Sequence, residues 1–315
     1  MGGEDSKPAP PPKPQPTPQP ATRVVYRDPP RAKTPPLTST PWRAMKEKWG
    51  PGFSQKLQDE TKSISIECGD VKKPGLLLLG PIKAGKSTFI NSIFSIGKGR
   101  LVNKAYTGSA NKSFTVSFTR YRGTGLLKNF RLCDTMGVED DEEEGFHVSD
   151  IVHLIEGHIR DNYKFNPRSA LTSKDHAYNP CPKPEEKIHC VVFVIDALVL
   201  SSGSISNGMR RKIHHLQEEI RKRDVPRVLV LTKVDLLCQK VAEDIRNIFS
   251  STKVQKAVKK ASEIFAIPES NIHPVKNYEG EIEIDPLKNI PLLLALRQII
   301  HFASDYLEEN DHDSD

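Results

Sequence analysis

The sequence predicts an α/β domain built on a doubly wound, mostly parallel sheet, and three observations support this fold class. Continuous apolar runs occupy residues 75–79, 190–195 and 227–231, as strands require when a sheet is covered on both faces. Stretches with helical periodicity separate or follow these runs, which is the alternation of a doubly wound fold. The chain of 315 residues is long enough for one large core, and its prolines concentrate before this region.

The prolines mark a leader that we expect to be disordered. Of 25 prolines, 13 lie at or before Pro41, and residues 8–20 alternate proline with short or polar residues. Such a segment lacks the apolar surface that would offset its ordering entropy. The predicted organisation is a basic leader over 1–40, a short segment over 41–66 that packs on the main domain, the main domain over 67–309, and an acidic tail over 310–315.

The elements of the main domain follow from the periodicity of each stretch. A strand over 75–79 leads through a glycine-rich loop into a helix over 88–96. The later elements are strands over 114–121, 130–133 and 190–195, a helix over 207–222, a strand over 227–231, a helix over 242–265, a strand over 271–273 and a helix over 290–307. Asn289 is the expected cap of the last helix, with Pro291 near its first position. The polar stretch 161–187 indicates an insertion.

The charge is concentrated in the leader, which bears on partners and location. Residues 1–48 carry nine Lys and Arg against four Asp and Glu, out of a formal net charge of +6. The rest of the chain is nearly neutral, so we expect no nucleic-acid partner. The five cysteines are scattered singly, and we find neither a signal peptide nor an apolar run of the roughly 18 residues that span a membrane. These features predict a cytoplasmic protein with unpaired thiols.

Two short motifs in the leader suggest contacts outside the main domain. Residues 1–6, MGGEDS, match the N-myristoylation pattern, and an acylated Gly2 next to a basic segment would favour membrane association. Residues 8–13, PAPPPK, match an SH3-ligand pattern. The alternative interpretation of the proline-rich stretch is a flexible spacer.

The strongest motif is GPIKAGKS at residues 80–87, between an apolar strand and a helix. This spacing is typical of the phosphate-binding loop, whose backbone N–H groups surround a β-phosphate at a helix N-terminus. Lys86 is expected to bridge the β- and γ-phosphates, and the Ser87 hydroxyl to bind Mg²⁺. The nucleotide-binding residues predicted here are Gly80, Pro81, Ile82, Lys83, Ala84, Gly85, Lys86, Ser87 and Thr88.

A second motif, DTMG at residues 134–137, follows the expected strand over 130–133. Phosphate-loop proteins place an acid of the magnesium site at this position. Asp134 would hold Mg²⁺ through water, and Gly137 would offer its backbone N–H to the γ-phosphate. The alternative is an ordinary turn, but its position after the phosphate loop favours the functional interpretation.

A third motif, TKVD at residues 232–235, directly follows the strand over 227–231 and predicts guanine recognition. A carboxylate at Asp235 can accept hydrogen bonds from guanine N1–H and the exocyclic N2 amino group, which adenine cannot supply. Thr232 and Lys233 belong to the same site, with the Lys233 stem packing on the purine. Lys276 and Asn277, in the VKN that follows the strand over 271–273, are expected to close over the base.

Turnover depends on residues near the γ-phosphate. Small GTPases usually place a water-orienting Gln after the DxxG glycine, but Val138 follows here, so unassisted hydrolysis should be slow. Lys83 is a candidate catalytic cation, with an exposed lysine as the alternative. Thr107 is the candidate magnesium-sensing hydroxyl, with Thr115 as runner-up. The acidic run over 139–144 is expected to be a solvated loop, with a docking surface for a basic partner as the alternative.

The order GPIKAGKS, DTMG, TKVD and VKN is that of translation-factor-like GTPases, so the expected fold is a P-loop GTPase with a Ras-like G domain. In the detailed sequence of its motifs the chain resembles the interferon-induced protein 44 family over roughly residues 41–308. The resemblance is carried by PWR at 41–43, LLLLGPIKAGKSTFINSI at 76–93, EGHI at 156–159 and VKNY at 275–278. It implies an interferon-inducible cytoplasmic GTP-binding protein linked to antiviral responses. Better-known members carry an N-terminal TLDc domain, which the proline-rich leader does not match.

The predicted function is therefore that of a GTP- and GDP-binding, magnesium-dependent switch. Its hydrolysis would be slow, or assisted by a partner such as a second copy of the chain. One alternative is an adaptor whose nucleotide site is structural and whose leader recruits partners. The other is a P-loop ATPase, which differs in base selectivity.

Overall fold

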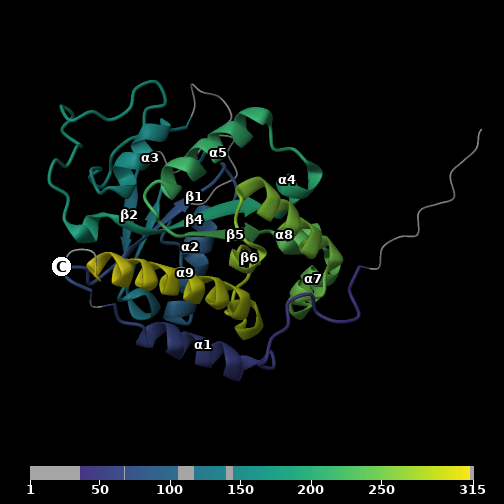
Figure 1. The fold of residues 1–315 in the computed structure, drawn as a ribbon. Coiled ribbons are helices and arrows are strands. Elements are labelled where there is room, and N and C mark those ends of the chain that lie inside the picture. Colours follow the sequence, from purple (N-terminus) through teal and green to yellow (C-terminus); the bar gives the residue numbers. More distant parts are fainter. Residues whose placement is uncertain (1–35, 67, 106–116, 140–144, 313–315) are drawn as a thin grey trace, which may run out of the picture. The chain divides into compact units, whose positions relative to one another are not determined.

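The computed structural model describes residues 36–66, 68–105, 117–139 and 145–312, and these form the predicted doubly wound α/β fold (Figure 1). The strands are β1 (Gly75–Leu79), β2 (Thr119–Arg122), β3 (Arg131–Asp134), β4 (Ile188–Asp196), β5 (Arg227–Thr232) and β6 (Ile272–Pro274). They lie in the order β2-β3-β1-β4-β5-β6. All neighbouring pairs are parallel except β2 with β3, so the prediction of a mostly parallel sheet is confirmed.

Helices connect the strands and cover both faces of the sheet (Figure 1). The α-helices are α1 (Pro51–Ser63), α2 (Lys86–Lys98), α3 (Val148–Ile155), α4 (Ala197–Ser202), α5 (Asn207–Arg221), α6 (Val234–Leu237), α7 (Gln239–Glu243), α8 (Thr252–Phe265) and α9 (Pro286–His312). The short 3-10 helices are η1 (Gly125–Leu127), η2 (Pro184–Glu186), η3 (Ile245–Phe249) and η4 (Glu269–Asn271).

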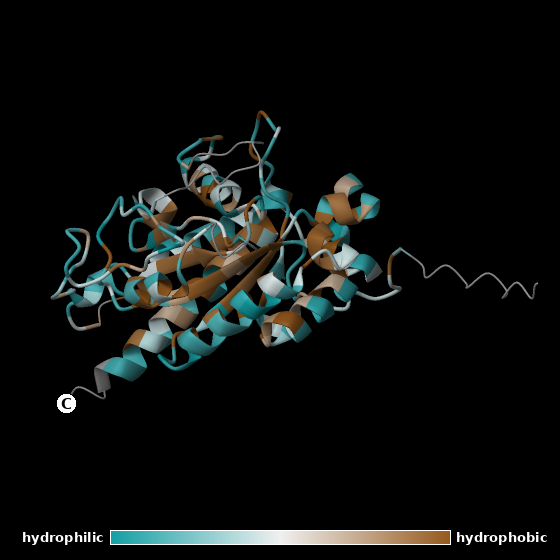
Figure 2. Cartoon of the chain, turned by 90° about the horizontal axis from the view of Figure 1, so that it is seen from above, coloured by the Kyte–Doolittle hydropathy of each residue, from teal (hydrophilic) through white to brown (hydrophobic). Residues whose placement is uncertain are grey.

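The core lies in two layers, one on each side of the sheet. Side chains alternate along β1, so Leu77 and Leu79 pack with α3, α4, α5 and α8, whereas Leu76 and Leu78 pack with α1, α2 and α9. Residues of β1 and β4 are buried throughout, as their continuous apolar runs require. Figure 2 shows the result as brown strands in the centre and helices with teal outer faces.

One predicted helix is wrong. The stretch 242–265 has helical periodicity, yet the chain forms α7, η3 and α8 with breaks at residue 244 and at residues 250–251. The Asp244 side chain accepts a hydrogen bond from the Arg246 N–H, and Ser251 accepts one from Val254 N–H. Short polar side chains compete for backbone donors in this way, and each begins a new helix here instead of continuing the old one.

The last helix begins earlier than predicted. Asp285 caps α9 by accepting a hydrogen bond from the Leu287 N–H at 2.8 Å, and Pro286 takes the first position. Pro291 therefore lies inside the helix. Asn289, the predicted cap, is instead buried and receives a hydrogen bond from a tyrosine hydroxyl described below.

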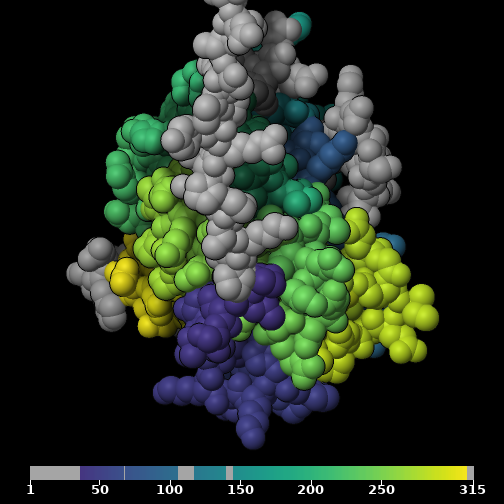
Figure 3. Space-filling view, turned by 90° about the vertical axis from the view of Figure 1, so that its right-hand side faces the viewer, coloured from purple at the N-terminus to yellow at the C-terminus, as the bar shows by residue number. Residues whose placement is uncertain are grey.

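The segment between residue 36 and α1 hydrogen-bonds to residues of η3, η4 and β6, and Figure 3 shows the purple part of the chain packed against green parts of the domain. The Trp42 ring meets the Phe249 ring edge-on at 5.6 Å, and the Trp42 N–H donates to the Phe249 carbonyl. The Arg43 guanidinium donates to the carbonyls of Ile272 at 2.9 Å and Glu269 at 2.5 Å. The segment therefore holds the start of β6 in place.

The insertion over 161–187 is built from turns and loops, with η2 near its end. A buried carboxylate organises it: Asp150 on α3 accepts hydrogen bonds from the Leu171 N–H at 2.8 Å and the Tyr163 hydroxyl at 3.1 Å. Arg120 on β2 pairs with Asp161 at 2.7 Å. These contacts fix the loop to α3 and the edge of the sheet.

No helix in the described part of the chain is long and apolar enough to cross a membrane. All five cysteines lie in the described ranges, and no disulfide joins any two of them.

Trp42→Ala should lower the free energy of unfolding by about 2–3 kcal/mol, because a half-buried aromatic ring leaves a gap beside Phe249. Urea denaturation would measure this loss. Trp42→Phe is the matched control, since it keeps a ring in contact and should lose less than Trp42→Ala. A change below about 0.5 kcal/mol in Trp42→Ala, the scale of an ordinary surface substitution, would mean that the segment adds little to the domain.

Candidate functional site

The predicted motifs converge at the carboxyl edge of the sheet. The loop over 80–85 follows β1, DTMG begins at the end of β3, TKVD begins at the end of β5, and VKN follows β6. These strands are neighbours or near neighbours in one parallel sheet, so their carboxyl ends meet at one edge. Open α/β sheets bind ligands at this edge.

The loop over 80–85 bends sharply into α2. Gly80 and Gly85 have φ of 157° and 93°, and Lys83 adopts the left-handed conformation with φ of 60°. Gly85 is the N-cap of α2 and supplies no side-chain hydrogen bond to the first turn. The start of α2 is therefore left uncapped by its own side chains, as an anion site requires.

Lys86 is buried inside this loop. Its ammonium donates to the carbonyls of Gly80 at 2.9 Å and Pro81 at 3.1 Å. Burial lowers the pKa of Lys86, and the nearby Asp134 carboxylate opposes that shift. The cation is thus held at the centre of the loop, where a phosphate would meet it.

Two oxygen groups lie beside the start of α2. The Ser87 hydroxyl donates to Asp134 Oδ2 at 3.2 Å, and Asp134 is fully buried and accepts the Thr135 N–H at 3.0 Å. Oxygens of this kind suit Mg²⁺, which usually takes one or two protein oxygens and completes its shell with phosphate and water. The described residues contain no cluster of three or more His, Cys, Asp or Glu side chains that would bind a metal alone.

DTMG lies directly on the phosphate loop. A Cβ at Gly137 would stand 2.8 Å from the Ile82 nitrogen and 2.9 Å from the Ile82 Cα, so only glycine allows this approach. The Val138 N–H donates to the Gly80 carbonyl at 2.9 Å, and the Val138 side chain is 4% exposed. The backbone after Gly137 is therefore tied to the loop.

Thr232 and Lys233 brace the phosphate loop from the other side. The Thr232 hydroxyl lies 2.6 Å from the Ala84 carbonyl and is fully buried. The Lys233 ammonium donates to the Lys83 carbonyl and to Asp196 Oδ2, each at 2.8 Å. Sequence reasoning missed Asp196. It ends β4 as Asp134 ends β3, and that shared position was the available signal.

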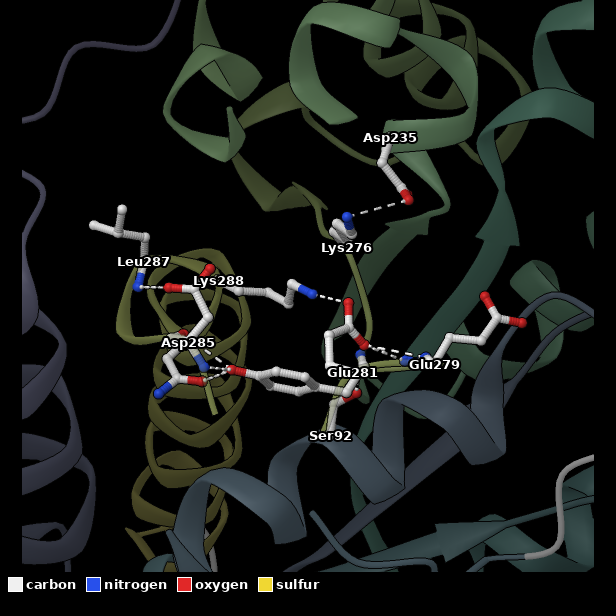
Figure 4. A network of polar contacts seen from close by, with 11 residues as sticks. Ser92, Asp235, Lys276, Glu279, Glu281, Asp285, Leu287 and Lys288 are labelled. Carbon is white, nitrogen blue, oxygen red and sulfur yellow. Dashed lines mark hydrogen bonds and ion pairs between the residues drawn. The ribbon is translucent and has the colours of Figure 1, made fainter. Parts of the chain in front are cut away.

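Asp235, Lys276 and Asn277 come together beside Gly85. The Lys276 ammonium lies 3.8 Å from an Asp235 carboxylate oxygen (Figure 4), and the Asn277 amide donates to the Gly85 carbonyl at 3.3 Å. The Asn277 Oδ1 atom is buried and has no hydrogen-bond partner within the described ranges. An acceptor left open in this way fits a site that binds a ligand.

Some predicted residues lie outside the described residues, namely Thr107, Thr115 and positions 140–144 of the acidic run. Glu139 is described, and its carbonyl accepts a hydrogen bond from the Lys212 ammonium at 2.8 Å. The leader motifs at residues 1–6 and 8–13 also lie outside the described ranges.

The chain matches the family model described as 50S ribosome-binding GTPase over residues 76–233. It is 34% identical over 238 residues to interferon-induced protein 44-like of Homo sapiens, covering 74% of this chain and 52% of the relative. It is 32% identical over 243 residues to interferon-induced protein 44 of Mus musculus, covering 76% and 57% respectively. The chain spans about half the length of these curated relatives. A structure of Toc33 from Arabidopsis thaliana in complex with Mg²⁺ and GMPPNP is 17% identical with a TM-score of 0.43, over 81% of this chain and 94% of that chain.

Gly137→Ala should lower the free energy of unfolding by about 1–3 kcal/mol, because the new methyl group overlaps the backbone of Ile82. Denaturation would measure this, and the Val138 amide should exchange its hydrogen faster as the loops separate. Gly280→Ala is the control, since a Cβ there meets nothing within 4 Å. Equal stability of the two variants would contradict the described approach of DTMG to the loop.

Proposed function

We propose that the chain, which belongs to the GTPase family whose model it matches over residues 76–233, binds GTP and GDP with Mg²⁺ at the carboxyl edge of its sheet. One observation carries the proposal. The TKVD and VKN motifs, and Val138 directly after DTMG, all donate hydrogen bonds to carbonyl groups of the loop over 80–85. A phosphate site and a base site therefore share one loop.

The phosphates would be held by the start of α2 and by Lys86. The uncapped N-terminus of α2 offers backbone donors and positive potential, and the buried Lys86 ammonium already lies within the loop. Ser87 and Asp134 would hold Mg²⁺, Asp134 through water, and Thr107 remains the candidate for a further ligand. When bound, Mg²⁺ neutralises charge on the phosphate oxygens.

The base would be recognised on the other side of Gly85. Asp235 can accept hydrogen bonds from guanine N1–H and the N2 amino group, which adenine does not offer together. Lys276 balances the charge of that carboxylate, and Asn277 supplies an open carbonyl acceptor. The Lys233 stem would pack on the purine, while its ammonium donates to Asp196 and the Lys83 carbonyl.

Hydrolysis by the isolated chain should be slow. In-line attack needs a positioned water, and Val138 has no side-chain group that could align one. Its side chain is also buried and its N–H is bound to Gly80. Lys83 lies at the exposed rim of the loop, where a partner or a second copy of the chain could bring it toward the γ-phosphate.

The biological proposal is a GTP-dependent switch in an interferon-linked antiviral response. It rests on the names of the curated relatives, of which this chain covers about half. Induction of the transcript by interferon, and a change in viral replication when the gene is deleted, would test it. Unchanged expression after interferon treatment would count against this role without affecting nucleotide binding.

Calorimetric titration should show that the protein prefers GDP and GTP to ADP and ATP in the presence of Mg²⁺. Asp235→Asn should weaken the binding of guanine nucleotides by about 1–3 kcal/mol, because the amide NH₂ group repels one of the two guanine donors whose hydrogen bonds the carboxylate accepts. Lys86→Ala is the matched control, since it removes a phosphate contact and should weaken guanine and adenine nucleotides alike. Equal affinity of the wild type for GDP and ADP would refute guanine recognition.

GTP turnover should rise with protein concentration if a second copy assists hydrolysis. Measured across a range of concentrations, Lys83→Ala should remove that rise while leaving GDP affinity within about twofold, as expected for a rim residue. A fast rate that is independent of concentration in the wild type would refute the assisted mechanism. An unchanged rate in Lys83→Ala would exclude this lysine from it.

A further inference from the structure

The base-side residues Lys276 and Asn277 belong to a connection, residues 275–285, that joins β6 to α9. The Val275 N–H continues the sheet by donating to the Leu231 carbonyl at 2.8 Å. Beyond it the chain leaves the sheet and turns toward α9. Loop residues hold a precise position only when further contacts fix them. Tyr278, the residue after Asn277, makes those contacts.

Its backbone is fixed to the helix of the phosphate loop. The Tyr278 N–H donates to the Ser92 hydroxyl at 2.9 Å, and that hydroxyl donates to the Thr88 carbonyl at 2.8 Å. Ser92 is fully buried, and Thr88 lies in the first turn of α2. A short path of hydrogen bonds thus runs from the start of α2 to the residue that follows Asn277.

The Tyr278 side chain is fixed to the last helix. Its hydroxyl accepts the Asp285 N–H at 2.8 Å and lies 2.7 Å from Asn289 Oδ1, to which it donates. Tyr278 is 6% exposed and Asn289 is 2% exposed. These bonds are protected from water, so breaking one leaves a buried polar group without a partner.

A charged pair, Lys288 with Glu281, lies next to the Tyr278 ring. The Lys288 ammonium lies 4.8 Å from the Tyr278 ring centroid and pairs with the Glu281 carboxylate (Figure 4). Glu281 also accepts the Glu279 N–H at 2.8 Å. Although burial alone would raise it, the hydrogen bond from Lys288 and those from the loop backbone hold the pKa of Glu281 at about 2.

We propose that Tyr278 is a positioning residue for guanine recognition, which clamps residues 275–285 between α2 and α9 so that Lys276 and Asn277 stay at the base site. This inference rests on the proposed binding of guanine nucleotides. Tyr278 is not itself placed against the nucleotide. Its effect passes through the loop, so loosening the clamp should weaken recognition of the base and spare the phosphate contacts.

The test compares the affinities of the full chain for GDP and for ADP, each with Mg²⁺. Tyr278→Phe and Ser92→Ala should each raise the dissociation constant of GDP by about three- to tenfold, the size expected for one lost buried hydrogen bond. The dissociation constant of ADP should stay within about twofold, since ADP binds through its phosphates. Because both contacts hold one loop, the double variant should raise the dissociation constant of GDP by less than the product of the two single fold-changes.

Tyr163→Phe is the matched control. It also removes a tyrosine hydroxyl bond, the one to Asp150, but in the insertion. It should lower the melting temperature without changing the ratio of the GDP and ADP affinities. The positioning role is overturned if Tyr278→Phe weakens GDP and ADP equally, or if it behaves like Tyr163→Phe. A wild type that does not prefer GDP to ADP would overturn the proposed function, and the inference with it.

Discussion

The site depends on how the carbonyl groups of the phosphate loop are used. The Gly80 carbonyl accepts hydrogen bonds from the Lys86 ammonium and the Val138 N–H. Those of Lys83, Ala84 and Gly85 accept from Lys233, Thr232 and Asn277. An anion needs donors around it and is repelled by bare carbonyl oxygens. By occupying these acceptors, the neighbouring loops leave the donors of α2 and Lys86 to dominate the field inside the loop.

These hydrogen bonds to the carbonyl groups of the loop also explain why the motifs lie close together in the structure. A loop that gives its carbonyl groups to three other segments can keep its shape only if those segments are themselves fixed. The strands β1 and β4, which are buried throughout, and β5, which is buried after its first residue, provide this, because their ends lie at one edge and are packed from both sides. Gly137 adds a steric condition, since DTMG can reach the loop only without a Cβ.

The residues of TKVD make two different kinds of contact. Thr232 and Lys233 bond to the backbone of the phosphate loop, and Lys233 also pairs with Asp196 at 2.8 Å. Asp235 instead lies beside Lys276, where we propose that the base is recognised. Two of the four residues in the motif that the sequence suggests for base recognition therefore stabilise the backbone of the loop over 80–85.

The sequence by itself determined the buried strands β1, β4 and β5 and the loop over 80–85, because their signals are local, whereas the strand predicted over 114–121 is described only as β2 (Thr119–Arg122). An apolar run such as GLLLL favours a strand that is buried on both faces, and β1 is such a strand. The spacing of GPIKAGKS between a strand and a helix favours the loop that is observed before α2. The end of the stretch 242–265 was also predicted correctly, but its interior was not. Periodicity records which side chains face the core and does not register a cap such as Asp244 or Ser251.

Only the tertiary structure decided which distant polar groups meet. Asp196 pairs with Lys233, and Ser92 receives the backbone of Tyr278, although 37 and 186 residues separate the partners. Asp285 caps the last helix, so Asn289, which the sequence suggested as the cap, lies inside the helix. Its buried side chain accepts the hydrogen bond from the Tyr278 hydroxyl. Such contacts depend on the relative placement of whole strands and helices. The burial of apolar surface fixes that placement, and no local pattern of residues encodes it.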